Sequence, residues 1–201
     1  MIYLSGVIQA DMPAMITPRM RQGPPAGQVW AADNGRFASP EEYTDELYLT
    51  WLARWAPEAP RCLFATAPDV VGDALATLEL SLPMLWVIRE QGYPAALVAQ
   101  DGLEALRVPW ADFDALFVGG TTAWKLGEAA HELAAEALRR QKHLHMGRVN
   151  SLRRLRIARA MGCHSVDGTF LRWGPDQNRP RLAAWYRELD LQPDLGLGRT
   201  R

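Results

Sequence analysis

The chain has 201 residues, of which 48% are hydrophobic and 22% charged, a composition typical of a globular protein with a sizeable core. No apolar run approaches the roughly 18 residues that a membrane-spanning helix needs, and the first residues lack the basic leader of a secretion signal. Cys62 and Cys163 are too few for a disulfide framework or a cysteine-rich zinc site. We therefore expect a single domain over 1–201 in the cytoplasm, with no membrane association, no cofactor and no metal.

Charge is unevenly distributed along the chain, although the net charge is only −1. Residues 139–201 contain 14 Lys and Arg against 5 Asp and Glu, whereas residues 1–138 contain 8 against 18. A basic half is typical of proteins that bind a polyanion such as nucleic acid. The alternative is a set of solvated helix faces, and charge alone does not separate the two interpretations.

Short apolar runs typical of buried strands alternate with amphipathic segments typical of helices. In chain order the prediction is strand 1–7, strand 28–33, helix 40–55, strand 61–68, helix 73–91, strand 95–100, strand 115–120, helix 121–140, strand 143–147, helix 150–161 and strand 164–168. Ser39 and Pro40 are the expected N-cap and first residue of the first helix. The Pro-, Gly- and Arg-rich segment 17–28 is interpreted as a mobile loop, either a lid or a nucleic-acid contact, and the tail after Leu189 is expected to fray.

Strands that are apolar throughout and separated by helices predict an α/β protein with parallel strands. Seven strands fit a doubly wound sheet or a compact, incomplete (β/α)8 TIM-type barrel, which would be trimmed because such barrels usually have about 250 residues. Most predicted strands end at a polar residue or at a segment that contains glycine: Asp33, Asp69, Gln100, Gly119–Gly120, Met146–Gly147 and Asp167. In a barrel all these strand ends meet at one mouth, so the barrel is the favoured prediction.

Two of these residues, Asp33 and Asp167, form the candidate catalytic pair. A pair of carboxylates at one site is the usual equipment for cleaving a glycosidic bond, where one attacks the anomeric carbon and the other handles protons. The alternative is that each Asp only stabilises a turn, since Asp-Asn-Gly and Asp-Gly are strong turn formers.

Six short segments then occur in an order that is specific as a set, although each is common on its own. They are Asp33-Asn34-Gly35-Arg36-Phe37, the strand ending at Asp69, Val98-Ala99-Gln100-Asp101-Gly102, Val118-Gly119-Gly120, Leu144-His145-Met146-Gly147 and Val166-Asp167-Gly168. This pattern resembles the queuine tRNA-ribosyltransferase superfamily, closest in character to the phage-type deazaguanine DNA transglycosylases that lack the zinc segment. For a phage-encoded member, the location would be the host cytoplasm.

The chain also departs from that family at several positions. Arg36 replaces the second glycine of an Asp-Ser-Gly-Gly segment, and Gly168 replaces a cysteine after the nucleophile. The C-terminal zinc segment, which helps hold the tRNA in tRNA-acting members, has no counterpart here. The resemblance therefore implies DNA rather than tRNA as the polymer, and a free 7-deazaguanine as the incoming base.

The resemblance also implies a role for each matched residue. Asp167 would attack C1′ of the target nucleoside and expel guanine, and Asp33 would deprotonate the incoming base. Asp69 and Gln100 would read the edge of the base, with Gly119 and Gly120 allowing close approach of the backbone. Phe37 and Met146, with its neighbour Gly147, would enclose the purine plane. The alternative assigns Phe37 and Met146 to the core and the glycines to a tight turn.

A base must leave the duplex, or be single-stranded, before such chemistry can reach it. Five arginines are the candidate nucleic-acid contacts: Arg156, Arg159, Arg172, Arg179 and Arg181. His143 and His145 alternate along a predicted strand and point to the same side. A metal held by both and a carboxylate is conceivable, but we interpret them as structural.

The leading hypothesis is thus base exchange on DNA by a pentosyltransferase, through a covalent aspartyl–sugar intermediate. Three alternatives remain: the same chemistry on tRNA or a free nucleoside, a hydrolase in which water rather than a base resolves the ester, and a catalytically inactive nucleic-acid-binding barrel. The sequence is also compatible with a homo-oligomer.

Overall fold

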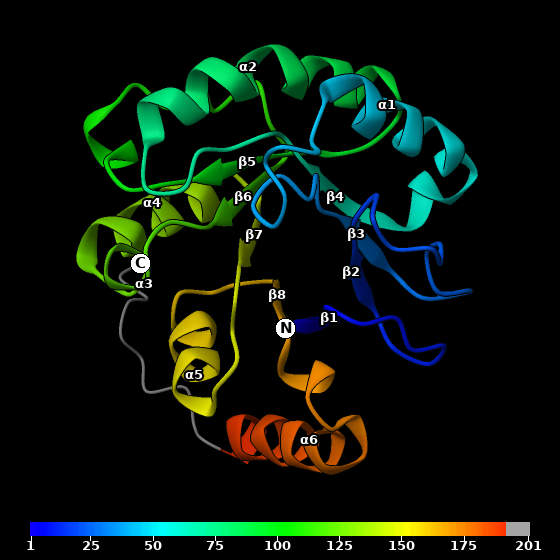
Figure 1. Ribbon diagram of the computed structural model, residues 1–201. Helices are drawn as coiled ribbons and strands as arrows, with labels where there is room; N and C mark the ends of the chain where they lie inside the picture. The colour runs from blue at the N-terminus through cyan, green and yellow to red at the C-terminus, as the bar shows by residue number, and fades with distance from the viewer. Residues whose placement is uncertain (192–201) are drawn as a thin grey trace.

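The computed structural model describes residues 1–191 and contains eight parallel strands that form one closed ring, each paired with the next in chain order (Figure 1). The strands are β1 (Ile2–Ser5), β2 (Ala14–Ile16), β3 (Trp30–Ala32), β4 (Cys62–Thr66), β5 (Ala95–Ala99), β6 (Ala115–Val118), β7 (His143–Met146) and β8 (Ser165–Gly168). The ring closes where β1 lies alongside β8 in register from Ile2–Ser165 to Ser5–Gly168. The fold is therefore an α/β barrel of the TIM type, as predicted, and its ring of eight strands is complete.

The strand that completes the ring, β2, was missed by the sequence analysis. Ala14, Met15 and Ile16 are all buried, but three residues are too few to produce a recognisable alternation. β2 pairs with β1 at Ser5–Ala14 and with β3 over its whole length. Its place in the sheet therefore depends on its neighbours rather than on its own pattern.

Six α-helices lie outside the barrel: α1 (Asp45–Arg54), α2 (Ala74–Glu90), α3 (Thr122–Lys125), α4 (Glu128–Arg139), α5 (Leu152–Ala160) and α6 (Pro175–Leu191). Short 3-10 turns cover Ala56–Arg61, Leu103–Ala105 and Phe170–Arg172. Within the described part of the chain, no helix is long and apolar enough to cross a bilayer.

Three helix predictions need correction. α1 begins after Thr44, whose side chain accepts a hydrogen bond from the Leu47 amide at 3.2 Å, so Ser39 is not the N-cap. The predicted helix 121–140 is split, and α4 starts after Gly127. α6 was not predicted and runs through Leu191, so the expected frayed tail is helical at its start and otherwise lies outside residues 1–191.

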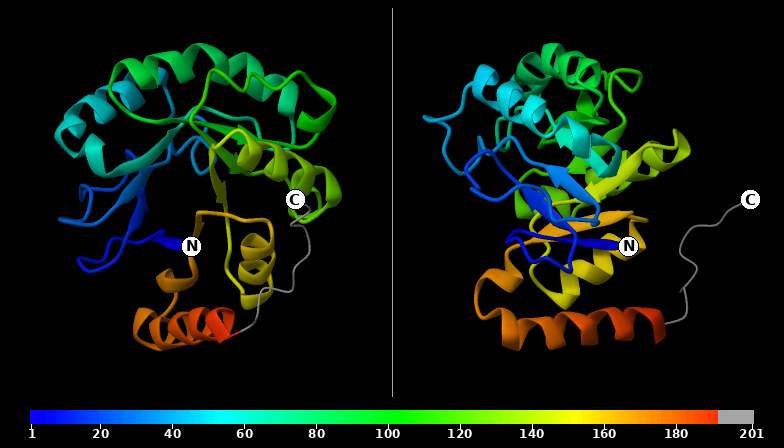
Figure 2. Two further views of the ribbon diagram at one scale, coloured as in Figure 1. Left: turned by 180° about the vertical axis from the view of Figure 1, so that it is seen from behind. Right: turned by 90° about the vertical axis from the view of Figure 1, so that its right-hand side faces the viewer.

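The barrel is small because three of its connections contain no α-helix, and the one between β5 and β6 has only the 3-10 turn Leu103–Ala105. β1, β2 and β3 are joined by loops at residues 6–13 and 17–29, where a full barrel has helices. These loops, with the segment after β3, project from the same end of the barrel in the right-hand view of Figure 2, opposite the end where the N-terminus lies. This end, where the carboxyl ends of the strands meet, is called the mouth below.

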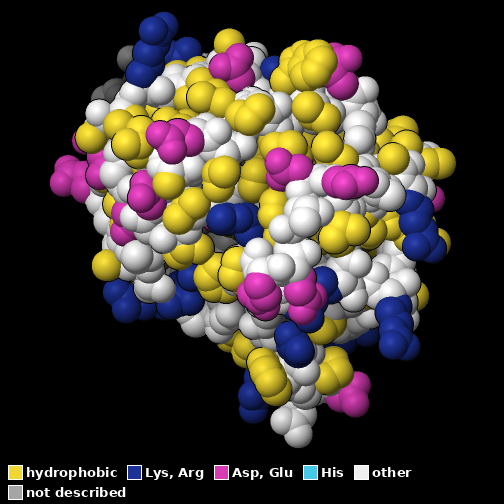
Figure 3. Space-filling model, turned by 45° about the horizontal axis from the view of Figure 1, so that its top comes forward, with side chains coloured by type: hydrophobic (Ala, Val, Ile, Leu, Met, Phe, Trp, Pro, Cys, Tyr) yellow, Lys and Arg dark blue, Asp and Glu magenta, His cyan; other side chains and the backbone are white. Residues whose placement is uncertain are grey.

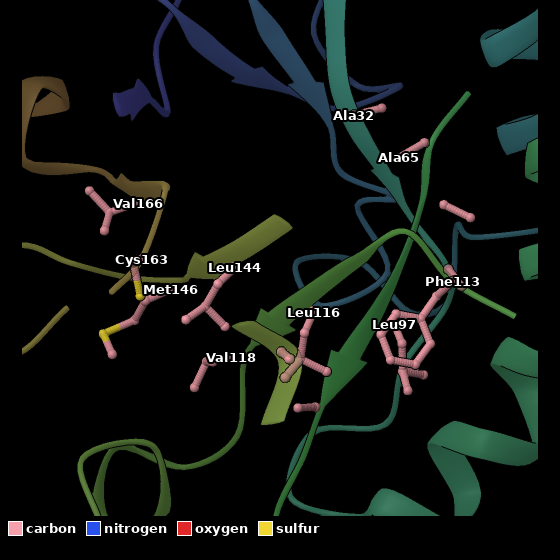
Figure 4. Close-up of a cluster of buried hydrophobic side chains, with 14 of the residues drawn as sticks. Ala32, Ala65, Leu97, Phe113, Leu116, Val118, Leu144, Met146, Cys163 and Val166 are labelled. Atoms are coloured by element: carbon pink, nitrogen blue, oxygen red, sulfur yellow. The ribbon is translucent and has the colours of Figure 1, made fainter. Parts of the chain in front are cut away.

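Alternating side chains divide the core into two layers. One set fills the barrel interior, and the other packs between strands and helices. The interior set contains Leu4, Met15, Ala31, Phe64, Ala96 and Ala115. The outer set contains the residues labelled in Figure 4: Ala32, Ala65, Leu97, Phe113, Leu116, Val118, Leu144, Met146, Cys163 and Val166. The alternation decides which residue of each strand can reach the mouth from inside.

Trp30 is the largest fully buried side chain, and it offers a test of the outer layer. Its ring packs edge-on against Trp51 and Tyr93, with centroids 6.3 and 6.0 Å away, and its indole N–H donates to the Glu58 carbonyl at 2.9 Å. We expect Trp30→Ala to lower the free energy of unfolding by about 3–5 kcal/mol, because it leaves a cavity and an unpaired carbonyl. Denaturant titration measures the change.

The matched control is Trp86→Ala, since Trp86 is 65% exposed on α2. That substitution should change the free energy of unfolding by about 0.5 kcal/mol or less. Equal losses in the two variants would contradict the packing described here.

Candidate functional site

A cavity of about 90 Å³ opens at the mouth of the barrel. It is lined by Asp33, Asn34, Phe37, Thr66, Asp69, Val71, Val98, Gln100, Phe117, Gly119, Gly120, Arg148 and Asp167. Seven residues singled out from the sequence are among them: Asp33, Phe37, Asp69, Gln100, Gly119, Gly120 and Asp167. They come from the ends of β3, β4, β5, β6 and β8, so the closed ring brings together positions far apart in the chain.

Asp33 lies directly after β3 in a tight, well-held turn. Its Oδ1 accepts a hydrogen bond from the Gly35 amide at 2.7 Å, and Gly35 has a φ of 78°, a backbone conformation that favours glycine. The buried Asn34 anchors the turn, because its backbone amide and side-chain Nδ2 both donate to Thr66 Oγ1 at 3.0 Å. Asp33 therefore stabilises a turn, as the alternative interpretation held, and also lines the cavity.

Burial raises the pKa of Asp33 to about 6, and the negative charges of Asp167 and Asp69 act in the same direction. The hydrogen bond from the Gly35 amide partly opposes this shift in pKa. A carboxyl with a pKa near neutrality can both take up and release a proton under physiological conditions. Asp33 thus has the electrostatic environment expected of an acid/base residue.

Asp167 is held by one of its two carboxylate oxygens. Oδ1 lies 3.1 Å from Nε2 of His145 and accepts a hydrogen bond from the Arg148 amide at 3.2 Å. Oδ2 has no hydrogen-bond partner among residues 1–191, and the side chain is 18% exposed towards the cavity. One oxygen is thus fixed while the other is free to react.

Asp69 and Gln100 form a pair rather than two independent contacts. Gln100 Nε2 donates to Asp69 Oδ2 at 2.6 Å, and Gln100 Oε1 accepts from the amides of Gly72 and Gly120 at 2.9 and 3.0 Å. Burial raises the pKa of Asp69, and the nearby Arg36 guanidinium opposes that rise. Gln100 is 2% exposed, so its principal role in this structure is to hold the Asp69 carboxylate in place.

The amides of the Gly119–Gly120 pair are already used within the protein. Gly119 donates to the Ala99 carbonyl at 3.1 Å, and Gly120 donates to Gln100. What the glycines provide is space, because a Cβ on Gly119 would lie 2.7 Å from Val98, and one on Gly120 would lie 2.4 Å from the ring of Trp124. A ligand can therefore still approach the backbone closely, as expected, but these two amides are not available to donate hydrogen bonds to it.

Arg148 is a cavity residue that the sequence analysis missed. It has a φ of 59°, which is rare for a residue with a side chain and costs about 1–3 kcal/mol, so it persists only where the surrounding contacts hold it. Its guanidinium donates to the Gly120 carbonyl and lies 5.6 Å from the centre of the Phe37 ring. A strained residue that spans the cavity in this way is typical of a functional site.

Lys125 of α3 supports this conformation from beneath. It is 1% exposed, and its Nζ donates to the Gly147 carbonyl at 2.7 Å. This carbonyl belongs to the peptide group that joins Gly147 to Arg148. Burial lowers the pKa of Lys125 to about 7, and the charge of Arg148 lowers it further, while Asp167 opposes the shift. Arg154 adds a hydrogen bond to the Arg148 carbonyl at 3.0 Å. No sequence motif signalled Lys125, since it lies in an ordinary helical pattern.

The two residues expected to enclose a purine differ in position. Phe37 is 63% exposed and lines the cavity, so it is placed to cover a planar ligand. Met146 is fully buried in the outer core layer and does not line the cavity (Figure 4). The reason is the alternation along β7, which turns His145 inward and Met146 outward. Gly147 lies behind the cavity wall, where a Cβ would meet the Phe117 ring at 2.6 Å.

Four of the five candidate arginines have partners within the protein, and one of them, Arg179, shares a hollow with Arg172 beside the loop after β1. Arg156 and Arg159 of α5 pair with Glu188 and Asp190 of α6, and Arg179 pairs with Asp11. Arg181 Nη1 donates to Asn178 Oδ1 at 3.3 Å. Arg172 instead lies at the mouth, in a hollow that it shares with Arg19 and Arg21. On the face shown in Figure 3, basic side chains are interspersed with acidic and hydrophobic ones.

His143 and His145 both point into the barrel, as their alternation predicted, and each lies within hydrogen-bond distance of Ser165 Oγ, at 2.7 and 2.8 Å. Among residues 1–191 no group of three His, Cys, Asp or Glu side chains is arranged to hold a metal ion. Cys62 and Cys163 are buried free thiols, and burial raises their pKa values to about 12.

Comparison with known proteins identifies no family for this chain. No protein-family model matches the sequence, and no curated protein matches it. Among solved structures, it is similar to the Bacillus subtilis YkuI protein, which has an EAL domain and was crystallised with its substrate c-di-GMP and calcium. The similarity covers 81% of this chain and 44% of that chain, at 12% identity and a TM-score of 0.44.

The raised pKa of Asp33 predicts a pH dependence of stability. A carboxyl whose pKa is higher in the folded than in the unfolded protein stabilises the fold below the unfolded value of 3.8, and this contribution is lost as pH rises through about 6. We expect the free energy of unfolding to fall by about 1–3 kcal/mol between pH 4 and 7 from this group. Asp33→Asn should remove that part of the decrease, as measured by denaturant titration at several pH values.

Asp112→Asn serves as the control, since Asp112 is an exposed carboxylate away from the mouth. It should leave the pH profile of the wild type intact. A profile that is the same in Asp33→Asn and the wild type would show that Asp33 is not perturbed.

Proposed function

We propose that this protein is a pentosyltransferase that exchanges guanine in DNA for a 7-deazaguanine through a covalent intermediate on Asp167. The observation that carries the proposal is the pair of carboxylates in the mouth cavity, Asp33 and Asp167, which have different environments. Asp33 has a pKa near neutrality, and Asp167 has one fixed and one free oxygen. Two carboxylates differentiated in this way support separate acid/base and nucleophilic roles.

The reaction would proceed in two displacements. The free oxygen of Asp167 attacks C1′ of the target deoxyribose, the bond from C1′ to guanine breaks, and the departing base takes a proton from Asp33. Asp33 then removes the proton from the ring nitrogen of the incoming 7-deazaguanine, and this nitrogen attacks C1′ and releases Asp167. Protons and charges balance over the cycle, because one base takes up the proton that the other gives.

The walls of the cavity suit a guanine-type base. The Asp69 carboxylate, held by Gln100, is an acceptor for the adjacent N–H groups on the edge of such a base. Gly119 leaves room for a flat ring, because its Cβ would meet the cavity residues Val98 and Gln100, and Phe37 lies at the exposed side with Arg148 over its ring. The residues that would recognise the base therefore lie beside those that would carry out the chemistry.

DNA is proposed as the polymer because of the resemblance to the members that lack a zinc segment, and because of the arginines at the mouth. Arg19, Arg21 and Arg172 share one hollow next to the ends of β1 and β2. Phosphates on either side of an extruded nucleotide would lie within reach of such a hollow. The alternatives are the same exchange on tRNA or a free nucleoside, and nucleic-acid binding without catalysis.

The deciding experiment supplies the purified protein with DNA that contains labelled guanine and with a set of free 7-deazaguanines. Mass spectrometry of the digested nucleosides identifies the product, and tRNA and free deoxyguanosine are tested in parallel. We expect release of label and a deazaguanosine in DNA. Asp167→Asn should reduce exchange by at least about 10³-fold, because it removes the nucleophile, whereas Asp112→Asn should leave the rate unchanged.

Each other outcome assigns a different function. Exchange in tRNA or in the free nucleoside alone would change the substrate and keep the chemistry. Binding of DNA with no exchange, by a folded protein and in the presence of every base, would favour the inactive barrel. A protein–DNA adduct on a denaturing gel in the absence of incoming base would identify the covalent intermediate directly.

The mouth arginines make a separate prediction about binding. Arg172→Ala should weaken binding of a DNA oligonucleotide and reduce the dependence of log affinity on log salt concentration by about 1, because one phosphate contact is lost. Arg156→Ala is the matched control, since Arg156 is paired with Glu188 on the flank. Fluorescence anisotropy at several salt concentrations measures both, and equal effects would place the DNA elsewhere.

A further inference from the structure

A line of polar side chains runs through the barrel interior from Asp167 towards the opposite end. Nε2 of His145 faces Asp167 Oδ1 at 3.1 Å, Nδ1 of His145 faces Ser165 Oγ at 2.8 Å, and the same oxygen faces Nε2 of His143 at 2.7 Å. His145 and Ser165 are fully buried, and His143 lies at the start of β7, at the end opposite the mouth. The interior of such a barrel is usually filled by branched apolar side chains.

Aromatic rings surround this line, and at its far end the ring of His164 stacks on that of His143, with centroids 5.2 Å apart. The ring of Phe64 lies 4.9 Å from that of His145 and 5.6 Å from that of His143, and the Phe117 ring lies 4.5 Å from His145. Burial lowers the pKa of both histidines, that of His143 to about 4, so both rings are neutral at neutral pH. A neutral imidazole has one donor and one acceptor nitrogen, and a hydroxyl has a single proton.

These limits leave one arrangement of protons when Asp167 is a carboxylate. His145 must donate from Nε2, because Asp167 Oδ1 can only accept. Nδ1 of His145 then accepts the Ser165 proton, and the Ser165 oxygen accepts the N–H from Nε2 of His143. Every donor in the line therefore points towards Asp167.

We propose that His143, Ser165 and His145 form a directed hydrogen-bond chain that ends at Asp167, with His145 as the positioning residue. The imidazole holds Oδ1 of the carboxylate from below while the Arg148 amide holds it from the side, and Oδ2 is left to face the cavity. Asp167 sets the direction of the chain, and its effect reaches His143 two hydrogen bonds further on. The part of this proposal that concerns protons is independent of the proposed function, whereas its effect on rate rests on it.

The direct test is nuclear magnetic resonance of the protein with ¹⁵N-labelled histidine, since long-range proton–nitrogen correlations distinguish the two neutral tautomers. In the wild type we expect His145 and His143 to carry their protons on Nε2 at neutral pH. In Asp167→Ala, we expect both signals to move towards the values of mixed tautomers. Asp33→Ala, which removes another carboxylate of the same cavity, should leave both histidines unchanged.

An Nδ1–H tautomer or an imidazolium at His145 in the wild type would overturn the proposal. Equal shifts of the His143 signal in Asp33→Ala and Asp167→Ala would also overturn it. His131 of α4, whose Nδ1 lies 2.8 Å from the carbonyl oxygen of the N-cap Gly127, provides an internal reference that no variant should move.

A kinetic test uses two substitutions at His145. Gln can place an N–H near the position of Nε2, whereas Met fills a similar volume without a donor. If exchange is observed, we expect His145→Met to lower the single-turnover rate of adduct formation by about 10- to 100-fold with little change in DNA affinity, and His145→Gln to restore most of it. Equal rates in the two variants would reduce His145 to a packing residue. Absence of exchange in the wild type would refute the proposed function while the tautomer measurement still decides the proposal made here.

Discussion

The site depends on the closure of the strand ring between β1 and β8. Only a closed ring of parallel strands directs the ends of β3, β4, β5, β6 and β8 to one mouth, and the pairing of β1 with β8 places Asp167 opposite Leu4 in the wall. Closure also gives the barrel an interior, where each inward-facing side chain must either pack against apolar neighbours or form hydrogen bonds with polar ones. Asp167 is therefore joined on one side to the cavity and on the other to the buried line of His145, Ser165 and His143.

Within this frame, the turn after β7 does much to shape the cavity. Arg148 adopts a left-handed backbone conformation. Lys125 donates to the preceding carbonyl of Gly147, Arg154 donates to the Arg148 carbonyl, and the Arg148 amide donates to Asp167. The cost of this conformation is offset by these contacts, one of which comes from the buried Lys125. The result is a guanidinium that reaches across the mouth to the Gly120 carbonyl and Phe37.

The electrostatics of the mouth follow from crowding three carboxylates into one cavity. Asp33, Asp69 and Asp167 repel one another, and each has a different compensation. Asp33 has an amide at one oxygen, Asp69 has Gln100 and Arg36, and Asp167 has an imidazole and an amide. Unequal compensation is what allows chemically identical side chains to take different roles.

Much of this protein was predictable from local sequence alone. Apolar runs and helical periodicity indicated seven of the eight strands and the positions of α1, α2, α4 and α5. Residues at strand ends indicated most of the cavity lining, because the carboxyl ends of the strands form the mouth of the barrel.

The tertiary structure alone decided the rest. Ala14–Ile16 forms a strand through its pairing with β1 and β3. Met146 faces away from the cavity because the register of β7 turns His145 into the barrel. Three of the candidate arginines form ion pairs with carboxylates on α6 or on the loop after β1: Arg156, Arg159 and Arg179. The contacts of Arg148, Lys125 and His145 are with residues distant in the chain. Periodicity is a local property that a sequence displays directly, whereas which side chains meet is determined by the closure and register of the whole barrel.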